Sequence, residues 1–240
     1  MDKITYKFLG RLSYEEGLRC QEKYHKICVN GGASGFFLAL EHEPTVTLGK
    51  HASDQDLLLP RDFFVQKGIR VHRSDRGGKL TCHMPGQIVL YPILPLDKLG
   101  FGVKAYVSLL EQSLLDLLGD HGVKGYLDKD NPGVWIGERK VASLGIRVKE
   151  RVSYHGLALN VSNDLKLFDW IVPCGMRTCR MTRLQDHTSF IPSIFELLWS
   201  LSLNIAKGLG KKLEKDAGTF DSCILDQNYE RKSARFSAQP

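Results

Sequence analysis

Apolar residues recur along the chain at two spacings, and each spacing predicts a different kind of element. Residues 103–118 have the helical spacing, because their apolar side chains fall on one face. Ser13 and Glu16 have the spacing of a capping box, which predicts a second helix that ends at Gly31-Gly32. A third helix is predicted by the apolar pattern of residues 194–206.

Shorter apolar runs bounded by turn residues predict strands. They lie at residues 35–40, 45–48, 69–73, 88–94, 133–136, 141–148 and 152–161. The last three follow one another closely, as in an antiparallel meander. This order of elements favours an α+β domain with a mixed sheet over strict βαβ alternation. We therefore expect one domain at residues 1–206, followed by a polar and mobile tail at residues 207–240.

Composition and charge narrow the class of protein. The 240 residues have ordinary globular composition and a formal net charge of +6, which excludes collagen-like and disordered chains. The most apolar stretch, residues 88–96, is shorter than the ~20 residues that a membrane helix needs. With no secretory signal in the sequence, we expect a cytoplasmic protein, and an organelle is equally compatible if a precursor is processed. No nucleic-acid-binding motif is present.

The positive charge is concentrated in two places. The first basic segment spans residues 61–83 and contains Arg61, Lys67, Arg70, Arg73, Arg76 and Lys79. The second basic segment consists of Arg177, Arg180 and Arg183. Either segment can be a solvated surface or a face for an acidic partner.

Motifs for nucleotide binding and serine hydrolysis are missing from the sequence. It contains neither GxxxxGK[ST], nor GxGxxG after a strand, nor the G-x-S-x-G elbow. Its cysteines do not form a CxxC pair, and no histidine pattern completes a zinc site. We therefore predict neither a cofactor nor a metal.

Three features could carry chemistry. The loop from Arg76 to Gln87 can present N–H groups and an imidazole to a carbonyl oxygen, or it can be a plain hairpin connection. Cys174 stands between Pro173 and Gly175 in a turn suited to a nucleophile, although most cysteines are small buried hydrophobes. Lys140 precedes an apolar strand, where a lysine usually faces water.

Four segments together resemble a known family. RGGKLTCHMPGQIVLYPI, GVWIGERKVASLGIRV, SYHGLALNVSNDL and IVPCG are similar, in order and spacing, to motifs of the lipoyl(octanoyl) transferases. The resemblance covers roughly residues 35–185. It departs from the family pattern at Met84, where glycine is usual, and at Cys82, where an aromatic residue is usual.

This resemblance implies a fold, an activity and partners. The fold would be that of the biotin and lipoate protein ligase catalytic domain. The activity would transfer an octanoyl group from octanoyl-acyl carrier protein to a lysine of a lipoyl domain. Such domains occur in 2-oxoacid dehydrogenase complexes and in the glycine cleavage H protein. Neither nucleic acid nor membrane is an expected partner, and either basic segment would dock the acidic carriers.

The resemblance also assigns the site residues. Cys174 would be the nucleophile and Lys140 its partner. The substrate pocket would be lined by Arg76, Gly77, Gly78, Lys79, Leu80, Thr81, Cys82, His83, Ser143, Leu144, Gly145, Gly156, Leu157 and Ala158. Backbone N–H groups near Gly77-Gly78 or residues 143–145 are candidates for an oxyanion hole. We expect His83 to orient the thioester carbonyl or to lie on a proton path.

Two alternatives remain at this point. A lipoate–protein ligase would share the fold and use free acid with ATP. A non-catalytic module would bind acyl groups or lipoyl domains without reaction. The Cys174 and Lys140 pair speaks against the ligase, and the intact motifs speak against the module.

Overall fold

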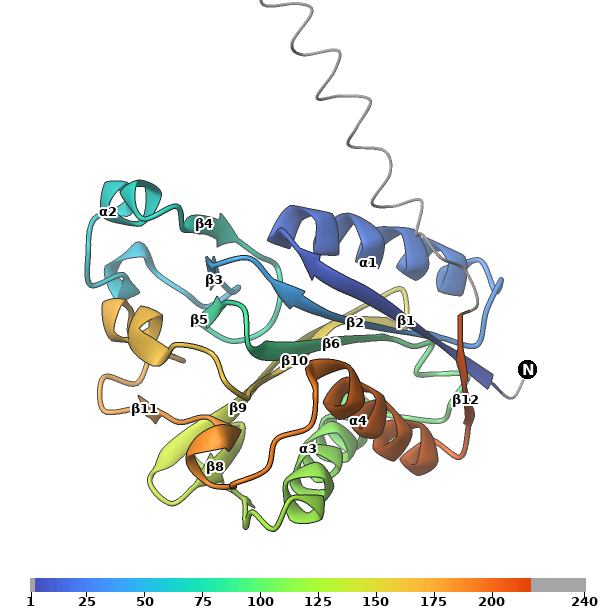
Figure 1. The fold of residues 1–240 in the computed structure, drawn as a ribbon. Coiled ribbons are helices and arrows are strands. Elements are labelled where there is room, and N and C mark those ends of the chain that lie inside the picture. The colour runs from blue at the N-terminus through green and yellow to red at the C-terminus, as the bar shows by residue number, and fades with distance from the viewer. Residues whose placement is uncertain (1–2, 217–240) are drawn as a thin grey trace, which may run out of the picture.

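A large mixed sheet forms the centre of the molecule (Figure 1). The structure is a computed structural model that describes residues 3–216. Within them, nine strands join in the order β12-β1-β2-β6-β10-β9-β8-β7, and β11 pairs with β9. Strand β1 runs parallel to β2 and β12, whereas the pairs from β2 to β7 are antiparallel. The bounds are β1 (Lys3–Leu12), β2 (Phe36–His42), β6 (Gln87–Ile93), β7 (Tyr126–Leu127), β8 (Val134–Ile136), β9 (Arg139–Lys149), β10 (Val152–Asn160), β11 (Arg180–Met181) and β12 (Lys212–Lys215).

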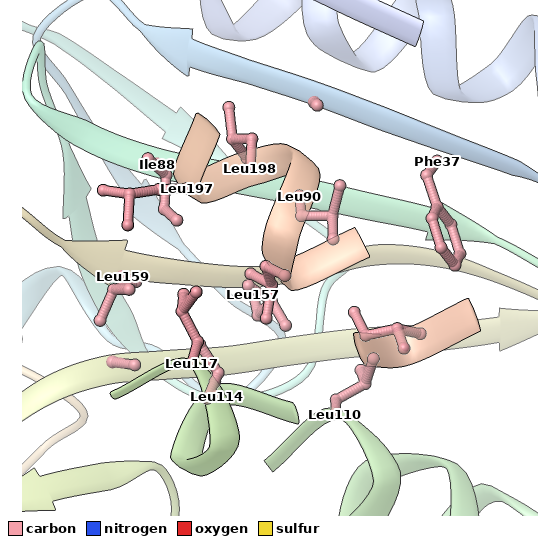
Figure 2. Close-up of a cluster of buried hydrophobic side chains, with 14 of the residues drawn as sticks. Phe37, Ile88, Leu90, Leu110, Leu114, Leu117, Leu157, Leu159, Leu197 and Leu198 are labelled. Carbon is pink, nitrogen blue, oxygen red and sulfur yellow. The ribbon is translucent and has the colours of Figure 1, made fainter. Parts of the chain in front are cut away.

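Helices cover both faces of this sheet. Helices α3 (Val103–Asp120) and α4 (Ile194–Gly208) pack together on one face, and α1 (Tyr14–Val29) lies on the other (Figure 1). Strand β2 contributes side chains to the cores on both faces of the sheet, because successive side chains of a strand point to opposite faces. Phe37 packs with the α3 and α4 leucines shown in Figure 2, whereas Leu38 packs with the α1 side chains.

A smaller sheet lies beside the large one. Its strands are β4 (Arg70–Arg73), β3 (Thr45–Leu48) and β5 (Leu80–His83), joined in the order β4-β3-β5. It shares a third core with α2 (Arg61–Gln66) and with the 3₁₀ segment Leu165–Trp170. Two further 3₁₀ segments are Asp54–Asp56 and Leu184–Asp186. The small sheet is important for the site because β5 follows the Arg76–Lys79 loop directly.

The structure confirms the predicted fold class, its three helices and the meander. Ser13 caps α1 in a capping box with Glu16, and β8, β9 and β10 are consecutive antiparallel neighbours. None of the helices in residues 3–216 is both long and apolar enough to cross a membrane.

The sequence did not predict α2, β1, β7 and β11, and two further segments differ from what was expected of them. The segment expected to be a loop contains β5, because residues 80–83 pair with β3 and are buried in the third core. The segment expected to be a mobile tail begins with the last two residues of α4 and contains β12, which pairs with β1 in register Lys3↔Lys212. The pattern of β12 is polar because it is an edge strand with one half-buried apolar side chain. The rest of the predicted tail, residues 217–240, lies outside the described residues.

Candidate active site

One cavity of about 160 Å³ brings most of the predicted site residues together. Of the predicted set, all but Gly77 and Cys82 line it. The Gly77 N–H donates to Ile146 O at 3.1 Å and holds the loop against β9. The Cys82 side chain points into the third core, where Sγ contacts Leu167 O at 3.6 Å. These two residues therefore lie beside the cavity and do not line it.

Five lining residues were missed by sequence reasoning. They are Tyr14, Val89, Tyr91, Pro132 and His155. Tyr14 is the first residue of α1, and the others come from strands and a loop, so no local pattern marks them. Val89, Tyr91 and His155 nevertheless stand in quoted motifs, and His155 immediately precedes the predicted Gly156.

Cys174 is a free, half-exposed cysteine in a turn anchored to β5. Its N–H donates to Leu80 O at 3.0 Å, and the Gly175 N–H donates to Val172 O at 3.1 Å. The Cys174 backbone has φ +55°, a conformation that side-chain-bearing residues adopt rarely and mainly where the surroundings impose it. The turn thus fixes the direction in which the thiol points.

Lys140 lies against this thiol and is only 2% exposed. Its Nζ lies 3.1 Å from Cys174 Sγ and also donates to Pro132 O. The space for this side chain exists because residue 133 is glycine. A Cβ on Gly133 would lie 2.9 Å from Nζ and 2.6 Å from Ala142 O. No carboxylate in residues 3–216 forms an ion pair with Lys140.

Arg76 connects the loop to the small sheet. Its guanidinium donates to Thr47 O at 2.6 Å, to Lys79 O at 2.7 Å and to Gly77 O at 2.9 Å. All of these acceptors are uncharged, so a buried cation lies at the wall of the cavity, and no carboxylate in residues 3–216 pairs with it. Such a charge favours negative charge nearby.

A chain of amides fixes the tautomer of His83. Asn160 Nδ2 donates to Thr182 O at 3.0 Å, so its Oδ1 accepts from Gln87 Nε2 at 2.9 Å. Gln87 Oε1 is then the acceptor for His83 Nδ1–H at 2.8 Å. Burial lowers the pKa of His83 well below its usual value, so the ring is neutral and its Nε2 is an acceptor. A neutral ring in this tautomer presents a lone pair at Nε2.

His42 determines the direction of the Tyr91 O–H bond by a similar chain of hydrogen bonds. His42 Nδ1 lies 3.0 Å from Leu12 O and must donate to that carbonyl. Burial lowers the pKa of His42 to about 4, so the ring is neutral. Its Nε2 therefore accepts from the Tyr91 hydroxyl at 2.7 Å. The phenolic proton points away from the cavity that Tyr91 lines.

Asp75 fixes His155. His155 Nε2 lies 2.7 Å from Asp75 Oδ1, and Asp75 Oδ2 accepts from Arg147 at 2.7 Å and from the Tyr154 hydroxyl. The hydrogen bond from His155 holds the pKa of the Asp75 carboxyl well below its usual range. Burial outweighs Asp75 and lowers the pKa of His155, so the neutral ring donates from Nε2. In residues 3–216, no group donates to its other nitrogen, Nδ1.

The two basic segments differ in how many of their arginines form ion pairs. In the first, Arg61 and Arg73 pair with Asp54, Arg70 pairs with Glu15, and Arg76 is buried. In the second, Arg183 pairs with Asp186. Arg177 and Arg180 are exposed and have no acidic partner in the described part of the chain.

Comparison with known proteins decides the family. Residues 13–198 match the lipoyl protein ligase A/B catalytic domain. An octanoyltransferase of Dictyoglomus turgidum is 37% identical over 232 residues, which cover 93% of this chain and 98% of the relative. The mitochondrial octanoyltransferase of Arabidopsis thaliana is 39% identical over 191 residues, 79% of each chain.

The chain belongs to the lipoyl(octanoyl) transferase family. It is accordingly an enzyme, an acyltransferase that moves an octanoyl group in lipoate synthesis.

Solved structures of related fold agree with this architecture. A lipoate-protein ligase A bound with ATP superposes with a TM-score of 0.72 at 15% identity, covering 99% of this chain and 96% of its own. A bipartite lipoate protein ligase of Thermoplasma acidophilum gives a TM-score of 0.71 at 15% identity, with 96% and 91% covered. At these identities the likeness shows the shared fold alone, so the difference in reaction must come from the site.

Proposed function

We propose that this octanoyltransferase takes its octanoyl group from acyl carrier protein and holds it as a thioester on Cys174. It then delivers the group to a lysine of a lipoyl domain. The contact of 3.1 Å between Lys140 Nζ and Cys174 Sγ supports this proposal most directly. It pairs a nucleophile with a proton-handling group at the wall of a largely apolar cavity in a chain of this family.

The first step forms one thioester and breaks another. The Cys174 thiolate attacks the carrier thioester, the tetrahedral intermediate collapses, and the carrier thiol leaves with a proton. Because a thioester replaces a thioester, the step is nearly isoenergetic. As an ammonium, Lys140 stabilises the thiolate electrostatically, and as an amine it takes the thiol proton.

The second step forms an amide. The amine of the acceptor lysine attacks the Cys174 thioester, and the Cys174 thiolate leaves. Lys140 is placed to receive the proton that the amine loses, because its Nζ already lies at the sulfur. An amide is more stable than a thioester, so this step is downhill and needs no nucleotide.

The N–H groups of Gly78 and Lys79 are the best candidates for the oxyanion hole. Neither makes a hydrogen bond within residues 3–216, whereas the Gly77 N–H is occupied by Ile146 O. Lys79 also packs so close to Gly175 that a Cβ there would collide with its side chain. Unoccupied N–H donors are what a tetrahedral oxyanion requires, and each such donor typically contributes ~3–4 kcal/mol.

Arg177 and Arg180 are the proposed docking site for acidic protein partners. They lie three and six residues beyond Cys174, so a partner held there would have its reactive arm near the thiol. The proposed partners are acyl carrier protein, the lipoyl domains of 2-oxoacid dehydrogenase complexes and the glycine cleavage H protein. The cytoplasmic location stays a prediction from the sequence.

A transfer assay tests this function against the ligase. Octanoyl-acyl carrier protein and apo lipoyl domain are mixed with the enzyme without ATP, and the octanoylated domain is measured by mass. The proposal expects transfer by the wild type and none above background by Cys174→Ala. Octanoylation that requires ATP and free octanoate, and that survives Cys174→Ala, would overturn the proposal in favour of a ligase.

A further inference from the structure

The peptide bond between Pro132 and Gly133 lies between two charged side chains. Its C=O accepts from Lys140 Nζ, and its N–H donates to the Glu111 carboxylate. In a trans peptide these two groups point in opposite directions, so the ammonium and the carboxylate lie on opposite sides of one peptide unit. Lys140 Nζ also contacts Cys174 Sγ at 3.1 Å. A continuous chain of hydrogen bonds thus leads from Glu111 to the dyad of Lys140 and Cys174.

Helix α3 provides Glu111 from outside the cavity. Leu110 and Leu114 of this helix pack in the core of the large sheet (Figure 2), and α3 contacts β8, which starts at Val134. Glu111 directly follows Leu110, is half-buried and does not line the cavity around Cys174. Its influence on the reaction must therefore pass through the peptide bond.

The buried charges around the dyad make an anion useful at this position. Lys140 and Arg76 are 2% and 8% exposed, and both line the cavity. Taking a cation out of water is unfavourable unless an opposite charge or hydrogen bonds replace its hydration. Burial raises the pKa of Glu111, and the Gly133 N–H and the attraction between Glu111 and Lys140 oppose this effect. Glu111 thus supplies a negative charge that balances Lys140 without entering the cavity.

We propose that Glu111 is a positioning residue that holds Lys140 at Cys174 and favours its ammonium form, acting through the peptide bond between Pro132 and Gly133. The inference rests on the proposed function, because that function gives Lys140 its part in octanoyl transfer. An anion at the N–H makes the C=O at the other end a stronger acceptor, since hydrogen bonds in a chain polarise one another. The same hydrogen bond anchors this segment to α3 and keeps Pro132 O where Nζ meets it.

Two substitutions separate the charge of Glu111 from its hydrogen bond. Glu111→Gln keeps an oxygen for the Gly133 N–H and removes the charge, whereas Glu111→Ala removes both. Asp116→Asn is the matched control, because it removes one charge from the same helix at an exposed position where the carboxylate accepts from Gln112 at 2.8 Å. All three variants retain the other titratable groups beside the dyad, which are Arg76, Lys79, Cys82 and Cys179.

The pH dependence of octanoyl transfer from carrier protein to apo lipoyl domain is the main measurement. An opposite charge nearby favours the charged form of a group, so the Lys140 ammonium loses its proton more readily without Glu111. The limb of the kcat profile that reports Lys140 should therefore move to lower pH by about 1 pH unit in Glu111→Gln. Glu111→Ala should also lower kcat at its optimum roughly 10- to 100-fold, because Lys140 is then no longer held in place. The KM of both substrates should stay unchanged, since Glu111 does not line the cavity.

Thermal unfolding distinguishes positioning from a purely structural role. Because burial raises the pKa of Glu111, the folded chain holds the ionised form less readily than the unfolded chain does. Glu111→Gln should therefore have a Tm no lower than that of wild type.

Three results would count against these claims, each in its own way. A wild-type pH profile in Glu111→Gln, or the same displacement in Asp116→Asn, would overturn the inference while octanoyl transfer by wild type stands. A Tm that falls together with kcat, with an unmoved profile, would overturn it in favour of a structural role. Absence of transfer by wild type would instead overturn the proposed function on which the inference rests.

Discussion

The glycine beside Lys140 provides a test of the dyad that alters neither of its members. In Gly133→Ala the new Cβ would lie 2.9 Å from Lys140 Nζ, and ordinary contacts begin near 3.4 Å. The ammonium must therefore move by about 0.5 Å or more, away from a position where it contacts Cys174 Sγ at 3.1 Å. Catalytic groups must be held within about 0.5 Å, and a 1 Å error can cost 10²-fold. We expect kcat to fall roughly 10- to 100-fold.

The same substitution also strains the backbone. Gly133 has φ +120°, and holding a side-chain-bearing residue in such a region costs about 1–3 kcal/mol. For a chain of this size that corresponds to a fall in Tm of roughly 2–12 °C. Activity must therefore be measured well below the lower Tm, by octanoyl transfer at saturating donor and acceptor.

Gly137→Ala is the control for the strain of a positive φ, and it lacks the 2.6 Å approach to Ala142 O that the Gly133 Cβ would make. Gly137 has φ +54°, and a Cβ there would meet no atom within 4 Å. This variant should lose stability and retain wild-type kcat. A Gly133→Ala enzyme with wild-type kcat would refute the reasoning that Lys140 must be held at Cys174. An equal loss of kcat in Gly137→Ala would assign the effect to strain in this hairpin.

Two further predictions concern stability and docking. Burial lowers the pKa of His42 from 6.5 to about 4, so the unfolded chain binds a proton there that the folded chain does not. The stability from this site is complete above pH 6.5, and about 3 kcal/mol is lost as the pH falls to 4. Tm measured from pH 7 to 4 should fall less steeply in His42→Asn, and an equal slope would argue against this assignment. For docking, Arg177→Glu with Arg180→Glu should raise the KM for acyl carrier protein and flatten its dependence on salt. Arg61→Glu is the control because Arg61 is already paired with Asp54, and a larger effect there would assign docking to the first basic segment.

Local signals in the sequence were sufficient for the three long helices and for most strands, whereas the short helix α2 was not predicted. Ser13 with Glu16 marks the start of α1, and the leucine spacing of α3 and α4 marks the faces that cover the sheet. Strand β1 escaped prediction because its apolar residues are separated by lysine, threonine and glycine. Strand β12 escaped because an edge strand needs only one apolar side chain against the core.

The site depended on information that is not local. Cys174 and Lys140 are 34 positions apart, and only the family motifs connected them before the structure did. Tyr14 enters the cavity from the first turn of a helix, and His155 enters it from a strand position with φ +56°. Which atoms of His83 and Tyr91 donate depends on their contacts with Gln87 and His42. These partners lie on other strands, and no motif in the sequence indicates the contacts. Cys82 shows the opposite error, since it belongs to a motif and points away from the cavity.

The acyl-enzyme is the central claim, and its mass tests it most directly. Wild type, Cys174→Ala and Cys179→Ala are each mixed with octanoyl-acyl carrier protein and measured intact by mass spectrometry. The account predicts one added octanoyl group on wild type and on Cys179→Ala, removed when apo lipoyl domain is added, and none on Cys174→Ala. An adduct that persists in Cys174→Ala, or one that apo lipoyl domain cannot discharge, would contradict it.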